Sequence, residues 1–325
     1  MIKTIIASLC ILLAMTVQAI DTADVHVRDP FIFANEADST YYLYKSKSPA
    51  WDIAAERGGV EMLTSRDLKN WSDPLVVLEI PVDNWGTGTI WAPEMHKIGE
   101  KYYIFATVNE SSVWKRWPNG EGVPQRGTQI FVADSPMGPF IALEDKLPAT
   151  PVGQLCLDGT FWNEGGKNYM VYCHEWVELS DGTVEMVELD NAMKPIGNPI
   201  RLFNGSSSEW SVGFRNNGRD CYVTDGVFLY KSPDTGNLYM IWSSNSKDGY
   251  ALGVARSKTG KITGPWVQNK QPLFSQNGGH GMIFRGFDGK LWLVLHGPNN
   301  PEGAERMHLF EIEEFNDTLR IKDEN

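Results

Sequence analysis

Gly99-Glu100-Lys101-Tyr102-Tyr103-Ile104-Phe105 is the stretch that decides the fold, because its pattern recurs five times along the 325-residue chain. In each copy a turn rich in Gly, Asn or Lys precedes a short aromatic and aliphatic run. The other four runs are Tyr41-Tyr42-Leu43-Tyr44, Tyr169-Met170-Val171-Tyr172, Tyr239-Met240-Ile241-Trp242 and Leu291-Trp292-Leu293-Val294. Such runs after tight turns are typical of β-hairpins.

Each run is expected to be the middle strand of three. The strands before the runs are predicted at Phe31-Ile32-Phe33, Glu94-Met95-His96, Thr160-Phe161-Trp162, Val227-Phe228-Leu229 and Met282-Ile283-Phe284. The strands after them are predicted at 60–64, 129–133, 184–189, 251–255 and 307–312. Repeats of roughly 50 to 70 residues without helical periodicity are typical of propeller blades. The sequence therefore predicts an all-β fold, a five-bladed β-propeller in a single domain over residues 20–325. A two-sheet sandwich would leave the five copies unexplained.

The first 19 residues have the pattern of a signal peptide. Lys3 provides the positive charge, residues 5–17 form the apolar run, and Val17-Gln18-Ala19 is a small-residue cleavage site. The apolar run is too short for a comfortable membrane span, so no integral membrane segment is expected. These features predict a secreted or periplasmic protein. Cys10 leaves a lipid anchor as the alternative, although Leu9 stands where a small residue is wanted.

Composition narrows the class of ligand. The net charge of −12 argues against nucleic acid, which requires clustered Lys and Arg. The chain has 12 Trp, 11 Tyr and 14 Phe, which suits both strand formation and stacking on sugar rings. Three cysteines remain after the leader, so at most one disulfide can form within the chain and no disulfide framework is expected. The sequence gives no indication of the oligomeric state.

The residue just before each inner strand is informative, because the inner strands of a propeller line one central channel. Asp29, Asp158, Asp225 and His280 stand at this point in the first, third, fourth and fifth repeats. A single Asp beside a strand is usually a turn former. Three Asp residues at the same position of three repeats are not explained as turn formers alone. Gathering like charges at a channel mouth shifts the pKa values of these groups. Glycoside hydrolysis needs such a set of carboxyl groups, one ionised and one protonated.

Four motifs surround these residues: Arg28-Asp29-Pro30, Trp91-Ala92-Pro93, Thr224-Asp225-Gly226 and Gly279-His280-Gly281. Together with Asp158 before its aromatic strand, they resemble glycoside hydrolase family 43 over almost the whole mature chain. The resemblance implies an inverting enzyme acting on arabinofuranosides, xylosides or related sugars. It implies that Asp29 is the general base and that Asp158 orients the acid and raises its pKa. It also implies a calcium ion at the channel axis, structural or electrostatic in role and contacted by His280 through ordered water.

The identity of the general acid stays open. The family commonly has Glu in a Thr-Glu-Gly-Pro turn, where this chain has Thr224-Asp225-Gly226-Val227. Asp is shorter by one methylene group, about 1.5 Å of reach, and a proton donor must come within about 2.6–3.2 Å of the leaving oxygen. Asp225 is favoured as the acid, with the substrate seated deeper. Glu175, at the end of the second strand of blade 3, is the alternative acid or a ligand for sugar hydroxyls.

Aromatic residues at mouth-facing turns are predicted to bind the substrate, with packing between blades as the alternative role. These residues are Trp91, Trp176 and Trp210, together with His296 at the end of a strand in blade 5. Trp51 and Trp114 are expected in longer loops at the pocket rim, and residues 108–127 are predicted to form a long loop that closes the pocket.

A closed pocket favours an exo-acting enzyme that releases terminal sugars from plant or microbial oligosaccharides or polysaccharides. We expect an α-L-arabinofuranosidase. β-Xylosidase and β-galactofuranosidase activities are the close alternatives, and a non-catalytic sugar-binding propeller is the alternative from another class.

Overall fold

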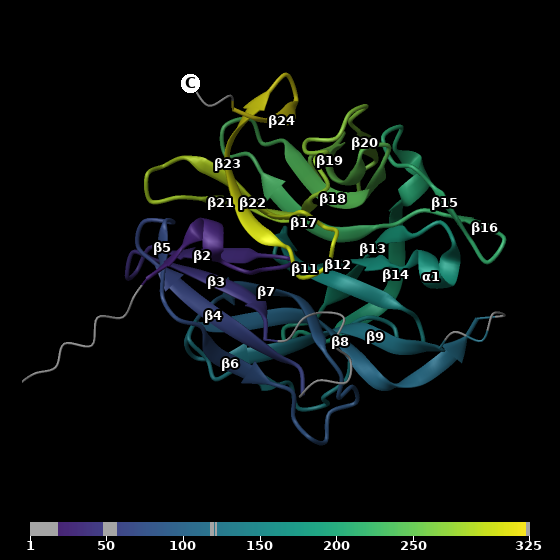
Figure 1. Ribbon diagram of the computed structural model, residues 1–325, viewed down its shortest axis with the longest axis horizontal. Coiled ribbons are helices and arrows are strands. Elements are labelled where there is room, and N and C mark those ends of the chain that lie inside the picture. Colours follow the sequence, from purple (N-terminus) through teal and green to yellow (C-terminus); the bar gives the residue numbers. More distant parts are fainter. Residues whose placement is uncertain (1–18, 48–56, 118–119, 121, 323–325) are drawn as a thin grey trace, which may run out of the picture.

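The computed structural model describes residues 19–47, 57–117, 120 and 122–322, and these form a five-bladed β-propeller (Figure 1). Each blade is an antiparallel sheet whose strands follow one another outward from the axis. The innermost strands β2, β7, β11, β17 and β21 contact one another in a closed ring. The predicted fold class is therefore confirmed.

The strands have the following bounds. Blade 1 contains β1 (Ile20–Asp21), β2 (Phe31–Asn35), β3 (Thr40–Ser46), β4 (Gly59–Ser65), β5 (Asn70–Trp71) and β6 (Leu75–Glu79). Blade 2 contains β7 (Ile90–Ile98), β8 (Lys101–Arg116), β9 (Gly122–Ala133) and β10 (Ile141–Ala142). Blade 3 contains β11 (Cys156–Glu164), β12 (Lys167–His174), β13 (Thr183–Leu189) and β14 (Pro195–Asn204). Blade 4 contains β17 (Asp225–Lys231), β18 (Leu238–Ser246), β19 (Gly249–Ser257) and β20 (Trp266–Gln268). Blade 5 contains β21 (Gly279–Arg285), β22 (Leu291–Gly297), β23 (Arg306–Phe315) and β24 (Thr318–Ile321).

A few short elements lie outside the five blade sheets. They are the hairpin of β15 (Phe214–Asn216) and β16 (Arg219–Cys221), the helix α1 (Trp176–Leu179), and the 3-10 turns η1 (Thr22–Asp24) and η2 (Gly205–Ser207). Among the described residues, no helix is long and apolar enough to cross a membrane.

The repeated aromatic runs lie in the second strand of every blade, namely β3, β8, β12, β18 and β22. Side chains on both faces of these strands are buried, because each blade is packed between two neighbours. Tyr44, Phe105, Tyr172 and Trp242 are among the largest fully buried side chains. This two-sided burial explains why the runs are continuously apolar rather than alternating with polar residues.

The N-terminal segment closes the ring between the last blade and the first. β1 pairs with β5 of blade 1, and His26 forms an antiparallel bridge with Arg306 of β23 in blade 5. The Arg306 guanidinium also lies 2.8 Å from Nδ1 of His26. The first and last blades are thereby joined by a segment that precedes the first inner strand.

Two expectations differ from the structure and two fall outside it. Residues 108–116 and 122–127 do not form an irregular loop, because they belong to β8 and β9, which continue as one long hairpin (Figure 1). Trp114 consequently lies on a strand, 36% exposed. The three described cysteines are free and buried, so no disulfide forms between them. The predicted leader up to residue 18, and Trp51, lie outside the described residues.

Candidate active site

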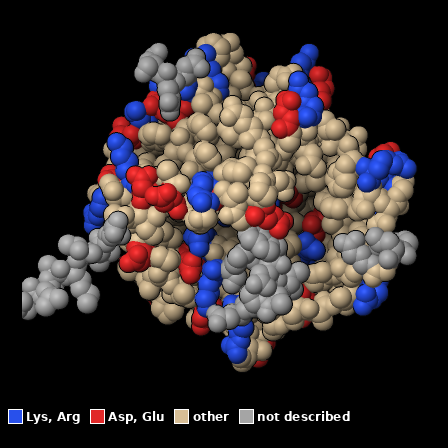
Figure 2. All heavy atoms as spheres, viewed as in Figure 1, with Lys and Arg blue, Asp and Glu red and all other residues tan. Residues whose placement is uncertain are grey.

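A cavity of about 490 Å³ opens at the end of the propeller axis where the inner strands begin. All five blades contribute to its lining, with Arg28, Asp29, Trp91, Asp158, Glu175, Trp176, Asp225, Tyr250, His280 and Asn299 among the residues. Figure 2 shows a hollow near the middle of the molecule, in which both acidic and basic atoms are visible. The cavity brings together most of the site residues predicted from the sequence.

A shared backbone feature points side chains at the axis. One residue at the start of each inner strand has a left-handed φ, between 42° and 55°: Asp29, Ala92, Asp158, Gly226 and His280. In blades 2 to 5 a register shift follows between this strand and its neighbour, as in a β-bulge. Such a φ costs a non-glycine residue on the order of 1–3 kcal/mol. The strain is thus concentrated where the charged side chains converge.

This feature corrects the predicted position of Asp225. The residue that matches Asp29, Asp158 and His280 in blade 4 is Gly226, so Asp225 lies one position earlier. Gly226 N–H donates a 2.9 Å hydrogen bond to Oδ2 of Asp158. A Cβ atom on Gly226 would come within 2.6 Å of the His280 ring. Glycine is therefore required for the imidazole and the Asp158 carboxylate to approach the backbone of blade 4.

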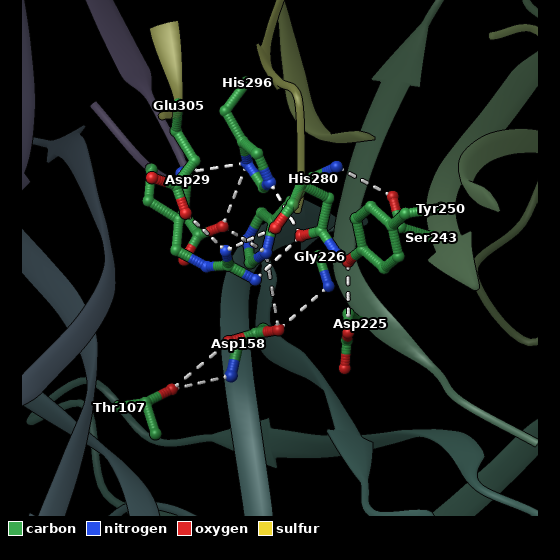
Figure 3. Close-up of polar contacts among 12 residues, drawn as sticks. Asp29, Thr107, Asp158, Asp225, Gly226, Ser243, Tyr250, His280, His296 and Glu305 are labelled. Atoms are coloured by element: carbon green, nitrogen blue, oxygen red, sulfur yellow. Dashed lines mark hydrogen bonds and ion pairs between the residues drawn. The ribbon is translucent and has the colours of Figure 1, made fainter. Parts of the chain in front are cut away.

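Asp29 lies between two imidazoles from blade 5 (Figure 3). Its Oδ1 is 3.0 Å from Nδ1 of His280 and 3.3 Å from Nδ1 of His296. Burial alone would raise the pKa of Asp29, but the charge and hydrogen bond of His280, together with the contacts of His296, outweigh it and hold this pKa well below the usual range. Burial likewise opposes protonation of His280, yet Asp29 and then Asp158 raise the pKa of His280 to about 10. Asp29 is therefore held ionised.

A hydrogen-bond chain behind Asp29 fixes its backbone. Asp29 N–H donates to Nδ1 of His296 at 3.2 Å, so Nε2 of His296 carries the hydrogen donated to Oδ1 of Asn299 at 3.1 Å. Arg28 donates to the same Asn299 oxygen and to Oε1 of Glu305, both at 2.8 Å. His296 is fully buried and supports Asp29 from behind, instead of lining the cavity as a sugar ligand. Asn299 and Glu305 were missed, because they follow a turn whose path the sequence does not reveal.

Asp158 and Asp225 lie in the opposite environment. Asp158 is anchored by Thr107, whose Oγ1 accepts a 2.8 Å hydrogen bond from its backbone N–H. Oδ2 of Asp225 accepts a 3.0 Å hydrogen bond from the Tyr250 hydroxyl. Burial and the neighbouring Asp158 charge together raise the pKa of Asp225 to about 7. Burial likewise raises the pKa of Asp158, against the pull of His280. Burial and the Asp158 charge therefore favour a proton on Asp225, although the Tyr250 hydrogen bond and the His280 charge act in the other direction.

Glu175 lies in the cavity wall directly before α1 and is 5% exposed. Its Oε2 is 3.3 Å from Nε of Arg126, which β9 brings in from blade 2. Burial, opposed by Arg126 and reinforced by Asp225, raises the pKa of Glu175 to about 7. Arg126 was missed from the sequence, although it is the only charged residue in β9 and so marks a strand position that needs a partner.

The three predicted tryptophans have different places. Trp91 lines the cavity and carries the Arg126 guanidinium 4.7 Å from its ring centre. Trp176 lines the same wall. Trp210 does not reach the cavity, because its ring turns into the core of blade 4 and lies 4.8 Å from the ring of Trp242. The missing side chain of Gly253 leaves the space for it, since a Cβ there would lie 2.2 Å from Trp210.

The described residues do not fit direct calcium coordination. Calcium takes six to eight oxygen ligands. Here the nearest carboxylates, Asp29 and Asp158, face the imidazole of His280 at 3.0 and 3.7 Å. Across the described parts of the chain, no group of three or more His, Cys, Asp or Glu is arranged to hold a metal. Metal binding through water at His280 stays a prediction.

A five-bladed propeller with one carboxyl group held ionised and another with a raised pKa at its axis has the machinery of a glycoside hydrolase. The chain belongs to glycosyl hydrolases family 43, whose sequence profile matches residues 22–315.

Three relatives, one solved and two curated, are named as an arabinase or as arabinofuranosidases. An endo-arabinase from Bacteroides thetaiotaomicron is 32% identical, with a TM-score of 0.80 over 92% of this chain and 98% of that chain. An extracellular exo-α-(1→5)-L-arabinofuranosidase of Streptomyces avermitilis is 23% identical over 65% of this chain and 43% of its own length. The α-L-arabinofuranosidase 43 of Humicola insolens is 21% identical over 59% of this chain and 37% of its own. The chain thus spans about two fifths of the length of these two curated relatives.

Proposed function

We propose that this glycosidase is an inverting, exo-acting α-L-arabinofuranosidase in which Asp29 activates water and Asp225 protonates the leaving oxygen. The observation that carries the proposal is the contrast between these two carboxyl groups in one cavity. Asp29 is held ionised by the His280 imidazole 3.0 Å away. Burial and the nearby Asp158 carboxylate favour the protonated form of Asp225, against the hydrogen bond that its Oδ2 accepts from the Tyr250 hydroxyl. An inverting glycosidase needs one ionised carboxylate as the base and one protonated carboxylic acid as the proton donor.

The neighbours also favour Asp225 over Glu175 as the acid. Both groups have a pKa raised to about 7. The strongest charged neighbour of Glu175 is a cation, Arg126, which stabilises its ionised form. The strongest charged neighbour of Asp225 is the Asp158 carboxylate, partly offset by His280. The general acid must enter the reaction with its proton, so the anionic neighbour suits the task. Asp158 would then raise the pKa of the acid and orient it.

The arabinofuranosyl specificity and the exo mode rest on the relatives and the cavity. By their names, the three relatives described above are one endo-arabinase and two α-L-arabinofuranosidases. A cavity of about 490 Å³ is within the range of small-ligand pockets. The name of the Bacteroides relative makes endo cleavage the second candidate. We also propose that residues 1–19 direct export, so that the enzyme meets polysaccharide outside the cytoplasm.

The test is a substrate panel combined with stereochemistry. Aryl α-L-arabinofuranoside, β-D-xyloside and β-D-galactofuranoside would be compared by kcat/KM, with the arabinofuranoside expected to be preferred. Proton NMR should show the released sugar first with inverted anomeric configuration. Linear arabinan should yield arabinose as the first product. Longer oligosaccharides as first products would establish endo cleavage, and binding without hydrolysis would establish a non-catalytic propeller.

A further inference from the structure

Arg126 connects two groups of the cavity wall that the proposed chemistry does not use. It stands on β9, the second strand of the long hairpin of blade 2, and its side chain is 11% exposed. Its guanidinium stacks 4.7 Å from the ring centre of Trp91 and lies 3.3 Å from the carboxylate of Glu175. Trp91 and Glu175 both line the cavity, whereas Arg126 lies behind them. One buried cation therefore sets the positions of an aromatic face and a hydrogen-bond acceptor.

The pair retains unused hydrogen-bonding capacity. Among the described side chains, Nε of Arg126 and Oε2 of Glu175 are buried without a hydrogen-bond partner, although they lie 3.3 Å apart. The second contact, from Nη1 of Arg126 to Oε1 of Glu175, is 3.5 Å long. A purely structural Arg–Glu pair usually forms two short parallel hydrogen bonds. Buried polar groups that lack such bonds are expected to meet another partner. Glu175 also lines the cavity, so a group bound there lies next to this loosely paired carboxylate.

The location of Glu175 indicates which part of a substrate it would meet. Glu175 comes directly before Trp176, which lines the same wall, and its charge interacts with that of Asp225. The proposed acid Asp225 donates its proton to the oxygen of the leaving group, so the departing sugar lies on the Asp225 side of the scissile bond. Asp29, with the attacking water, lies beside His280 and His296 of blade 5. The Glu175 wall is therefore on the leaving-group side.

We propose that Glu175 accepts hydrogen bonds from hydroxyl groups of the leaving sugar, and that Arg126 is a positioning residue that holds Glu175 and Trp91 in place for it. The ligand class is a neutral polyhydroxy unit, a pentose or hexose at the reducing side of the cleaved bond. A carboxylate accepts two hydroxyl hydrogens, and the face of Trp91 supports the apolar side of a sugar ring. The inference rests on the proposed function for its assignment of Asp225.

Glu175→Gln tests the proposal, because it keeps the shape of the side chain and removes the charge. A hydrogen bond to a charged group is typically worth enough to change binding by about 10- to 100-fold. KM for an arabino-disaccharide should rise by about that factor with little change in kcat. Kinetics on aryl arabinofuranosides, which have no leaving sugar, should change by less than about twofold for good and poor phenol leaving groups alike.

Arg126→Lys and Arg126→Met test the positioning role. Met should raise KM for the disaccharide as Glu175→Gln does, and Lys should restore part of it, because an ammonium still attracts Glu175. Glu188→Gln is the matched control, since it removes a carboxylate from the same blade where Glu188 forms a 2.8 Å ion pair with Lys167 near the surface. It should leave KM unchanged. Melting temperatures would show that each variant is folded.

Three outcomes would overturn the proposal. An unchanged KM for the disaccharide in folded Glu175→Gln would remove Glu175 from substrate binding. Losses that grow as the aryl leaving group becomes poorer would make Glu175 the acid instead. Equal losses on the disaccharide and on every aryl substrate would place Glu175 outside the leaving-group side.

A binding measurement separates this test from the proposed activity. Calorimetry on Asp29→Asn with arabino-oligosaccharides should show an affinity that the added Glu175→Gln substitution weakens. An unchanged affinity would likewise contradict the proposal.

Discussion

The two walls of the cavity shift the pKa of an aspartate carboxyl group in opposite directions. On the wall of blades 1 and 5, Asp29 is surrounded by His280, His296 and Arg28. On the wall of blades 3 and 4, Asp225 is surrounded by Asp158, Glu175 and the phenol of Tyr250. Both carboxyl groups are largely buried from water. Burial is therefore common to the two walls, and the difference in protonation comes from the sign of the neighbouring charges.

The comparison explains how a propeller can divide acid and base roles around one axis. The imidazoles come from blade 5 next to Asp29 of blade 1, whereas blades 3 and 4 both contribute carboxyl groups. Because the ring is closed, residues from blades 5 and 1 meet as neighbours although they are far apart in sequence. The hydrogen bond between Asp29 N–H and His296 joins positions 267 residues apart. The following predictions test whether the two walls act as this account requires.

Asp29→Asn should have the largest effect. The amide keeps nearly the same shape but cannot accept a proton from water, and loss of a general base typically costs about 10²–10⁴-fold in rate. Turnover of a nitrophenyl arabinofuranoside should decrease by at least about 10²-fold. The circular dichroism spectrum should stay unchanged, which would show that the variant is folded. Activity within tenfold of the wild type would remove Asp29 from the mechanism.

Trp210→Ala should destabilise the fold without altering the cavity. The indole is 6% exposed and packs on Trp242, so its removal should lower the free energy of unfolding by about 3–5 kcal/mol. Chemical denaturation measures this change, and KM at a temperature where the variant stays folded should match the wild type. A raised KM with little loss of stability would return Trp210 to the substrate site.

The pH dependence of kcat/KM should report on the wall of blades 3 and 4. The acid must carry its proton, and the pKa of Asp225 is raised to about 7, so activity should fall as the pH rises through about 7. Asp158→Asn removes a charge that raises this pKa, and the alkaline limb should then move to lower pH. An alkaline limb that stays in place in this variant would show that Asp158 does not tune the acid.

Chelation should have the smallest effect. If His280 holds a metal ion through water, EDTA should lower the melting temperature or the rate modestly, and added calcium should restore it. Differential scanning calorimetry with elemental analysis provides the measurement. No bound metal, together with unchanged melting and rate, would leave His280 as the charged partner of Asp29 alone.

The sequence was sufficient to predict structure where local patterns repeat along the chain. It was insufficient to predict contacts between residues that are far apart in the chain. The five aromatic runs predicted the second strands of the blades, because such runs are buried on both faces. Asp29, Asp158 and His280 were correctly aligned, whereas Asp225 was placed one residue too late in the pattern, because nothing in a sequence marks which residue of a bulge takes the left-handed φ. Trp210 was misplaced because its pocket is made by Gly253, on a strand 43 residues later. Arg126 was missed for a similar reason, since its partners Trp91 and Glu175 come from two different blades.

The most direct test of the central claim, that Asp225 supplies the proton, is the leaving-group dependence of Asp225→Asn. An activated phenol departs without much protonation, whereas a poor leaving group needs the acid. The rate ratio of wild type to Asp225→Asn should therefore be small on dinitrophenyl arabinofuranoside and increase steadily through nitrophenyl to phenyl and to a natural disaccharide. A ratio that is the same across the aryl series, with the increase appearing in Glu175→Gln instead, would contradict the account and assign the proton to the other carboxyl group of that wall.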